Sequence, residues 1–485
     1  MSSPIPVIVG VAQLEQRAAD PQAAKEPIEL MIDAVRAAAE DAGSVALLGA
    51  DSVRVIRGIW PYENPARAVA EAIGATGAET TLSPYGGNFV QTTLSLSAVD
   101  IQAGEKDIIV LTGAECGHSQ AKAAKAGHNL AYQDIAGAPD RYIAPEMEMR
   151  HAAEKAIRLG RPVQVYPIFE TALRAKLGHD IDTHQQHIAE LWASFSAVAA
   201  QNPHAWLRDA KTAQEIRTLS DINRPVSHPY PKFMNSNSNV DQAAAIILCS
   251  TTTAQRLGIP EEKWVYPWAG TDAHDHYFVS NRDNLYSSPA IRIAGSRALE
   301  MAATEVGQLD HVDVYSCFPS SVQVAARELN LDTHKPLTIT GGLTFAGGPM
   351  NNYVMHSIAR MVELLRDGAD KRGLITANGG YLTKHAFGVY SATPPEQPFQ
   401  HADLQAEVDA LPARSVVEAY TGTGSVEGYS VMYSAEGLDK AFVATRLEDG
   451  HRAWGVCNDR DVLQDMISQE YVGHQVRLQD HVATF

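Results

Sequence analysis

Cysteine is scarce in this chain. The 485 residues include only Cys116, Cys249, Cys317 and Cys457. These lie too far apart to suggest a disulfide scaffold or a Cys-x-x-Cys metal site. The pattern is typical of proteins from a reducing compartment, so we predict a cytoplasmic location.

Long apolar runs and an excess of basic residues are also missing. No run approaches the roughly 20 residues that a membrane-spanning helix requires. Residues 1–13 lack a basic region followed by an apolar core, the pattern of a secretory signal. The 39 Lys and Arg residues are outnumbered by 57 Asp and Glu residues, giving a net charge of −18. Because that balance repels phosphate backbones, we expect neither a membrane span nor a nucleic-acid partner.

Nucleotide-binding and metal-binding motifs are absent as well. No Gly-x-Gly-x-x-Gly follows the first predicted strand, and no Walker motif occurs. The sequence therefore gives no support to nucleotide-dependent hydride or phosphoryl transfer. His274 and His276 form a His-x-His pair, but two imidazoles are too few for a metal site, so none is predicted.

What the sequence does contain is a regular alternation of strands and helices. Short β-branched runs predict buried strands, and apolar residues at helical spacing predict helices between them. The clearest strands are 5–12, 51–60, 107–115, 239–250 and 373–378, and the clearest helices are 27–40, 91–103, 288–306 and 351–365. We therefore expect an α/β fold with mostly parallel sheets and helices on their faces.

The alternation divides the chain into two similar halves and a different C-terminal segment. The first half covers residues 1–260 and holds a helical insertion at about 117–230, and the second covers 261–395. A linker is predicted at 396–414 from its composition. Residues 415–485 show short alternating strands between turn residues, which predicts a small β-barrel, most like an OB-fold.

A glycine-rich loop carries the most specific motif. Residues 341–352 read Gly-Gly-Leu-Thr-Phe-Ala-Gly-Gly-Pro-Met-Asn-Asn, and glycine pairs allow a backbone to approach a ligand closely. The pattern resembles the thiolase superfamily, whose members carry Gly-Gly, a four-residue spacer and then Gly-His-Pro. Gly348 stands in the histidine position. With its C-terminal segment, the chain is most similar to thiolase-like proteins of type 1, relatives of the sterol-carrier-type thiolases that have an additional C-terminal domain.

This resemblance covers essentially the whole chain. It implies two α/β halves that together form five layers, with the insertion as a helical loop domain. It also implies acyl-CoA as the ligand, so that coenzyme A enters as part of the substrate and no separate cofactor is expected. Thiolases usually dimerise through their first half, but the barrel and the altered segment 80–88 could block that surface, so a homodimer and a monomer both remain open.

The resemblance points to Tyr315 and Cys317 as catalytic residues. In sterol-carrier-type thiolases a His-Asp-Cys-Phe motif lies at a strand-to-helix junction, and residues 315–318 here read Tyr-Ser-Cys-Phe. Cys317 matches the cysteine that exchanges a proton with the α-carbon of the substrate. Tyr315 replaces the histidine, as in retro-aldolases related to these thiolases. A phenol is a weak base at neutral pH but a good donor to a carbonyl oxygen. Burial as a packing residue is the alternative for Cys317.

The nucleophilic cysteine of the thiolase superfamily has no counterpart at the matching position of this sequence. The matching segment, 86–93, contains Asn88 but no cysteine. Thr92 and Thr93 have no evident base beside them, so we interpret both as residues that cap or pack the helix.

The last family motif, Cys-x-Gly, reads Ala377-Asn378-Gly379 here. We expect Asn378 and Gly379 to bind substrate together with Asn88, Gly347 and Gly348. His385 follows this turn and is the histidine best placed for catalysis, with a structural role as the alternative. His356 is expected on a helix surface.

These residues favour a thioester-binding protein that does not form the usual acyl-enzyme. The resemblance implies acyltransferase-class chemistry or a retro-aldol cleavage in which Tyr315 and Cys317 act directly. The alternative is a non-catalytic protein that binds acyl-CoA or a lipid thioester. The barrel segment mixes acidic with basic residues, unlike a nucleic-acid module, so we expect it to cover the substrate site or dock another subunit.

Overall fold

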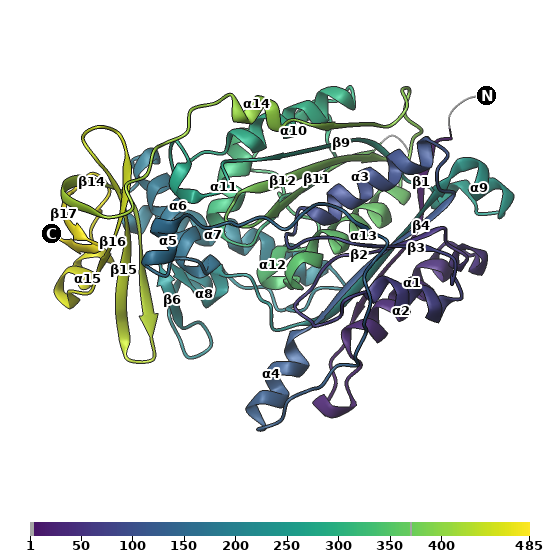
Figure 1. Ribbon diagram of the computed structural model, residues 1–485, viewed down its shortest axis with the longest axis horizontal. Helices are drawn as coiled ribbons and strands as arrows, with labels where there is room; N and C mark the ends of the chain where they lie inside the picture. The colour runs from purple at the N-terminus through teal and green to yellow at the C-terminus, as the bar shows by residue number, and fades with distance from the viewer. Residues whose placement is uncertain (1–3, 369–370) are drawn as a thin grey trace.

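The computed structural model describes residues 4–368 and 371–485, which form two sheets and a C-terminal barrel (Figure 1). No helix in that part of the chain is long and apolar enough to cross a membrane. Strands β4 and β8 are buried along their whole length, because the first sheet is covered on both faces. The six strands of this sheet are, in order, β1 (Pro6–Glu15), β8 (Asp241–Ser250), β4 (Ile108–Cys116), β2 (Ser52–Val55), β3 (Glu79–Leu82) and β5 (Arg141–Tyr142).

The second sheet repeats the plan of the first. Its five strands are, in order, β10 (His311–Asp313), β11 (Arg372–Gly379), β12 (Lys384–Ser391), β9 (Tyr266–His274) and β13 (Gln400–Asp403). In the series β1–β8–β4–β2 the successive pairings are antiparallel, antiparallel and parallel. The series β9–β12–β11–β10 shows the same three senses. The predicted duplication is therefore confirmed.

The sheets are mixed, and the prediction of mostly parallel sheets was wrong in this respect. Strands β8 and β12 each run antiparallel to both neighbours. Strand β12 follows β11 after a short turn, so it must return in the opposite direction. Apolar runs in a sequence report burial but not strand direction, which explains the error.

Two helices lie between the sheets and complete a five-layer arrangement (Figure 1). Helices α3 (Phe89–Gln102) and α13 (Tyr353–Arg366) contact strands of both sheets. Helices α1 (Pro27–Asp41) and α2 (Pro65–Ile73) pack on the outer side of the first sheet, and α10 (Pro289–Met301) packs on the second. His356 on α13 is buried, so the expectation of a surface position was wrong: a helix enclosed by two sheets has no solvent-exposed face there.

The predicted insertion is mainly helical. Its helices are α4 (Gly117–Lys125), α5 (Ala152–Ala156), α6 (Pro162–Leu177), α7 (Ile181–Gln201) and α8 (Ala213–Arg217). The remaining helices outside the barrel are α9 (Thr251–Arg256), α11 (Pro319–Glu328), α12 (Gly342–Phe345) and α14 (Gln405–Asp409). Helix α6 contacts both α11 and the barrel strand β14.

The C-terminal segment closes into a small barrel with its own apolar core. Closure follows from β14, which pairs with both β15 and β17. Strand β6 (Pro225–His228) of the insertion also pairs with β14, and β7 (Tyr230–Pro231) pairs with β6. The barrel elements are β14 (Tyr420–Ser434), β15 (Gly437–Arg446), β16 (Arg452–Cys457), α15 (Arg460–Met466), β17 (Gln475–Asp480) and β18 (Val482–Thr484).

The segment predicted as a linker, 396–414, contains regular structure instead. Strand β13 pairs in parallel with β9, and α14 packs against α10 and β9. The strand is hydrogen-bonded to the edge of the second sheet, and such main-chain bonding does not depend on composition. The proline-rich composition therefore led to the prediction of a linker, although the segment that connects the second half to the barrel contains a strand and a helix.

Candidate functional site

A cavity of about 490 Å³ lies where the two halves and the helical insertion meet. Five residues predicted from the sequence line it: Tyr315, Cys317, Gly348, Asn378 and Gly379. Its other walls come from the loop before α3, from α6, and from the segments 235–238 and 380–384. No residue of the segment 415–485 lines it, so the expectation that the barrel covers the site finds no support in this cavity.

Tyr315 offers a hydroxyl group to the cavity. Its backbone N–H donates to Thr376 Oγ1 at 2.9 Å, and its ring packs edge-on against Tyr353 with 5.5 Å between the centroids. These contacts fix the side chain. Burial, then the nearby Cys317, raises the pKa of Tyr315, so the phenol is neutral at physiological pH. Within the described residues no hydrogen bond is made by its hydroxyl, which is left to a ligand.

Cys317 carries a protonated thiol. Its Sγ lies 3.7 Å from Ser321 Oγ and 3.8 Å from Asn378 Nδ2. Burial raises the pKa of Cys317 to about 11, although hydrogen bonds with Tyr166 and Ser321 lower it. A thiol in this state is a proton donor rather than a nucleophile.

Two amide oxygens in the cavity wall lack partners. Asn378 Nδ2 donates to the Tyr166 hydroxyl at 2.9 Å, and Asn235 Nδ2 donates to the Pro231 carbonyl at 2.7 Å. The Pro231 carbonyl can only accept, and the Tyr166 hydroxyl gives its own proton to the Gly380 carbonyl at 3.2 Å, so both partners accept and the amide oxygens lie at the other ends. Both Oδ1 atoms are buried without a hydrogen-bond partner among residues 4–368 and 371–485. The wall thus presents acceptors that suit a ligand with a hydroxyl or N–H group.

The start of α3 offers no nucleophile. Thr92 Oγ1 donates to Asp272, and Thr93 Oγ1 donates to the Phe89 carbonyl at 2.5 Å. Neither residue lines the cavity. Asn88 also lies outside the lining and sits behind the loop, since a Cβ on Gly86 would come within 2.5 Å of Asn88 Oδ1.

At Gly348, where the superfamily motif has a histidine, the space beside the backbone is filled by another side chain. A Cβ atom on Gly348 would lie 2.3 Å from Ser236 Oγ, so the serine hydroxyl fills the space beside Gly348. Gly347 has φ = 114°, and a Cβ there would lie 2.2 Å from Gln242 Oε1. Gly347 therefore supports the loop from behind and does not line the cavity.

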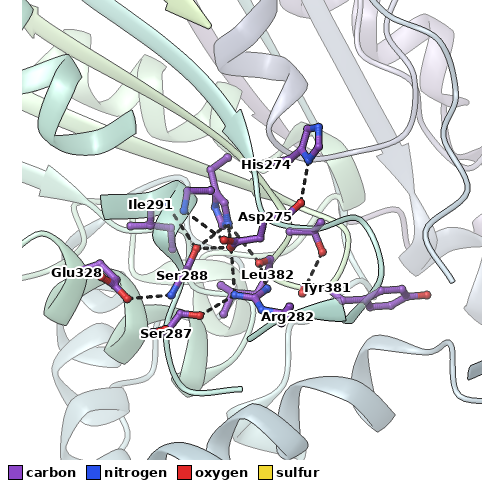
Figure 2. A network of polar contacts seen from close by, with 12 residues as sticks. His274, Asp275, Arg282, Ser287, Ser288, Ile291, Glu328, Tyr381 and Leu382 are labelled. Atoms are coloured by element: carbon purple, nitrogen blue, oxygen red, sulfur yellow. Dashed lines mark hydrogen bonds and ion pairs between the residues drawn. The ribbon is translucent and has the colours of Figure 1, made fainter. Parts of the chain in front are cut away.

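His385 lies in a buried polar network beneath the cavity rather than in its lining. Its Nε2 is 3.6 Å from Asp275 Oδ2 and 3.2 Å from the Leu382 carbonyl. Figure 2 shows the contacts that join Arg282 to Asp275 and to Leu382. Arg282 Nη2 donates to Asp275 at 3.0 Å, and Nη1 donates to the Leu382 carbonyl at 2.5 Å.

The network holds a strained turn. Leu382 has φ = 55°, a left-handed conformation that costs free energy in a non-glycine residue. Burial alone would raise the pKa of Asp275, but the charges of Arg282 and His385 and a hydrogen bond from Ser288 outweigh it and lower the pKa to about 2. The resulting ion pair fixes the turn that carries Gly380, Tyr381 and Lys384 into the cavity wall.

Lys384 is a site residue that the sequence did not single out for a role. Its Nζ lies 2.5 Å from the Tyr85 carbonyl and 5.0 Å from the centre of the Phe89 ring. Burial lowers its pKa to about 8. Its position directly after the Asn378-Gly379 turn was the only available signal, because Tyr85 and Phe89 are distant in the chain.

The arrangement of two equivalent sheets around α3 and α13, with a cavity at the junction of the halves, defines a thiolase-type protein. Residues 403–481 match the model of the thiolase-like protein type 1 additional C-terminal domain. The chain also resembles the crystal structure of a monomeric SCP2-thiolase-like protein type 1 from Mycobacterium smegmatis, with 30% identity, a TM-score of 0.85 and 100% of both chains covered. This protein belongs to the thiolase-like protein type 1 family.

More distant relatives share the fold. The Ltp2-ChsH2(DUF35) aldolase aligns with a TM-score of 0.61 at 17% identity, covering 80% of this chain and 98% of that chain. An acetyl-CoA acetyltransferase from Methanothermobacter thermautotrophicus is 22% identical over 249 residues, or 46% of this chain. The chain spans between 32% and 63% of the length of the curated relatives that it matches.

Proposed function

We propose that this protein binds an acyl thioester in the main cavity and cleaves a carbon–carbon bond by direct acid–base chemistry of the retro-aldol type. The observation that carries the proposal is the unpartnered Tyr315 hydroxyl, which shares the cavity wall with the Cys317 thiol. The name of the structurally related aldolase supports the reaction type. The acetyl-CoA acetyltransferases among its relatives support a thioester as the ligand.

A 3-hydroxyacyl thioester fits the chemistry of the wall. Water accepts its hydroxyl proton, the carbon–oxygen bond becomes a carbonyl, and the Cα–Cβ electron pair moves into the thioester to form an enolate. Tyr315 donates a hydrogen bond to the enolate oxygen, and Cys317 gives its proton to Cα. The protonated water then returns this proton to the Cys317 thiolate and restores the thiol. The products are an aldehyde or ketone and a shorter acyl thioester.

The acceptors and the cation of the wall support the same substrate class. The unpaired Oδ1 atoms of Asn235 and Asn378 suit the donor hydroxyl of such a substrate. Lys384 supplies a positive charge for an anionic ligand in a chain whose net charge is −18. An acyl-enzyme route has less support, because the hydroxyl groups of Thr92 and Thr93 are already bonded.

Non-catalytic thioester binding is the second candidate. Burial raises the pKa of both Tyr315 and Cys317, so both are protonated at neutral pH and neither is available as a base. A protein that only binds the thioester needs the cavity and Lys384 but no proton transfer.

Calorimetry and product analysis separate these functions. We expect 3-hydroxyacyl-CoA to bind and to release a carbonyl product. Tyr315→Phe should reduce turnover by about 10²-fold or more with little change in affinity, whereas the exposed Tyr142→Phe should change neither. Binding without product in the unaltered protein would favour the second candidate. Absence of binding by every acyl-CoA tested would contradict both.

We also propose that the protein is a monomer. The related protein from M. smegmatis is described as monomeric. In this chain the edge of the first sheet at β3 is paired with β5, and a covered edge is not available to a second sheet. Light scattering after gel filtration should give a mass near 52.4 kDa; twice that mass would contradict a monomer.

A further inference from the structure

A second cavity, of about 430 Å³, lies between α7, the end of α6 and α11. It shares no lining residue with the main cavity. Its wall combines an apolar floor with several groups that form hydrogen bonds. The apolar residues are Leu177, Leu191, Val322, Ala326 and Leu337, and the principal polar residues are His179, His187, Glu190, Gln323, Arg327 and His334.

Gln323 presents an unpaired acceptor at this second cavity. The residue is 6% exposed, and its Nε2 donates to Glu170 Oε1 at 2.7 Å. That bond fixes the orientation of the amide, because a flipped amide would place two oxygens against each other. Gln323 Oε1 is buried with no partner in the described part of the chain. A buried acceptor without a donor is costly, so the site favours a ligand that supplies one.

A buried network of polar side chains connects Gln323 with His179. Burial acts to raise the pKa of Glu170, but hydrogen bonds from His184, Tyr230 and Gln323 and the charge of His184 hold it below its usual value. The Glu170 carboxylate accepts from His184 Nε2 at 2.7 Å, so this nitrogen carries a proton. His184 Nδ1 lies 3.2 Å from His179 Nδ1. These contacts hold the His179 ring in the wall of the cavity.

The charged groups of the cavity narrow the class of ligand. An ammonium group would meet the exposed Arg327, and a carboxylate would meet Glu190 and the unpaired oxygen of Gln323. A hydroxyl group avoids both conflicts, because it donates to Gln323 Oε1 and accepts from a guanidinium or imidazole N–H group. The five aliphatic side chains provide contacts for an apolar body.

We propose that the second cavity is a binding site for a small apolar molecule that carries a single hydroxyl group, with Gln323 Oε1 as its hydrogen-bond acceptor. The site is independent of thioester binding in the main cavity. Gln323 and His184 share the Glu170 carboxylate as a hydrogen-bond partner, and this shared bond fixes the Gln323 amide.

Fluorine NMR of the full-length protein with 4-fluorophenol tests this site. The signal of the phenol should broaden on addition of protein, whereas 4-fluorobenzylamine and 4-fluorobenzoate should bind at least tenfold more weakly. Gln323→Leu should weaken phenol binding about tenfold, as expected for the loss of one buried hydrogen bond. Ala326→Phe should abolish binding because it fills the cavity while leaving the bond between Gln323 and Glu170 intact. The exposed Gln464→Leu on α15 is the control and should bind like the unaltered protein.

The proposal is overturned by any of three results: no broadening of the phenol signal, equal binding by the folded Gln323→Leu variant, or stronger binding of the amine or the acid. Circular dichroism establishes whether each variant is folded. If Gln323→Leu does not fold, phenol binding by Ala326→Phe is the remaining test. Unchanged binding by that variant refutes the site.

Discussion

The hydroxyl of Tyr315 lies directly against the backbone of Gly87. A Cβ atom at residue 87 would come within 2.7 Å of the Tyr315 oxygen and 2.6 Å of the Asn378 carbonyl oxygen. The loop before α3 can therefore close the cavity over Tyr315 only because residue 87 has no side chain. This contact links the first half of the chain to the two motifs of the second half.

Gly87→Ala should destabilise the protein by about 1–3 kcal/mol, the usual cost of an overpacked position, and weaken acyl-CoA binding. Gly77→Ala is the matched control, since a Cβ at Gly77 meets nothing within 4 Å. Denaturant unfolding and calorimetry measure the two effects. Equal stability of both variants would contradict the close packing of this loop.

Asp275→Asn should destabilise the protein by about 3–5 kcal/mol, because it leaves the buried Arg282 without its counter-ion. Asp182→Asn breaks an exposed ion pair with Arg217 and should have little effect. The same denaturant titration compares them. If Asp275→Asn is as mild as Asp182→Asn, the network in Figure 2 does not hold the turn at Leu382.

Glu115→Gln should remove a pH dependence of stability. Burial raises the pKa of Glu115 from 4.5 to about 7, although a hydrogen bond from the Ile59 N–H lowers it. The folded state thus keeps a proton that the unfolded state loses, and the free energy of unfolding falls by about 3 kcal/mol as pH rises from about 4.5 to about 7.

Unfolding at several pH values measures this slope for the unaltered protein, for Glu115→Gln and for the exposed control Glu448→Gln. Only Glu115→Gln should flatten the curve and be more stable than the unaltered protein at pH 8. A slope that survives in Glu115→Gln would refute the assignment.

Lys384 should make acyl-CoA binding depend on pH. With its pKa lowered to about 8, the ammonium is charged at pH 7 and largely neutral at pH 9. We expect affinity to fall by about tenfold at most over this range, the loss of one charge-assisted contact. Lys384→Arg should retain binding at pH 9, and Lys384→Met should bind weakly at both values. Identical pH profiles for all three proteins would show that Lys384 does not contact the ligand.

The sequence was most informative where a local pattern determines the outcome. The buried run at β4 and the helical spacing of α1 predicted both elements, and the motif residues Tyr315, Cys317 and Asn378 lie in one cavity wall. Contacts between distant segments had no such signal. Ser236 fills the space beside Gly348, and His385 joins Asp275 rather than the cavity lining; both depend on how the two halves pack.

Helix α6 connects the barrel to the main cavity. Tyr166 on this helix lines the cavity, while Thr171 exchanges two hydrogen bonds of 2.9 Å with the backbone of Tyr429 in β14. Arg174 reaches further and donates to Glu470 at 2.8 Å. A fragment that stops before residue 415 would therefore leave one side of this helix without its partners. Ligand screens and crystallisation of a shortened chain would sample a cavity whose wall has lost its outer support, even though every lining residue is still present.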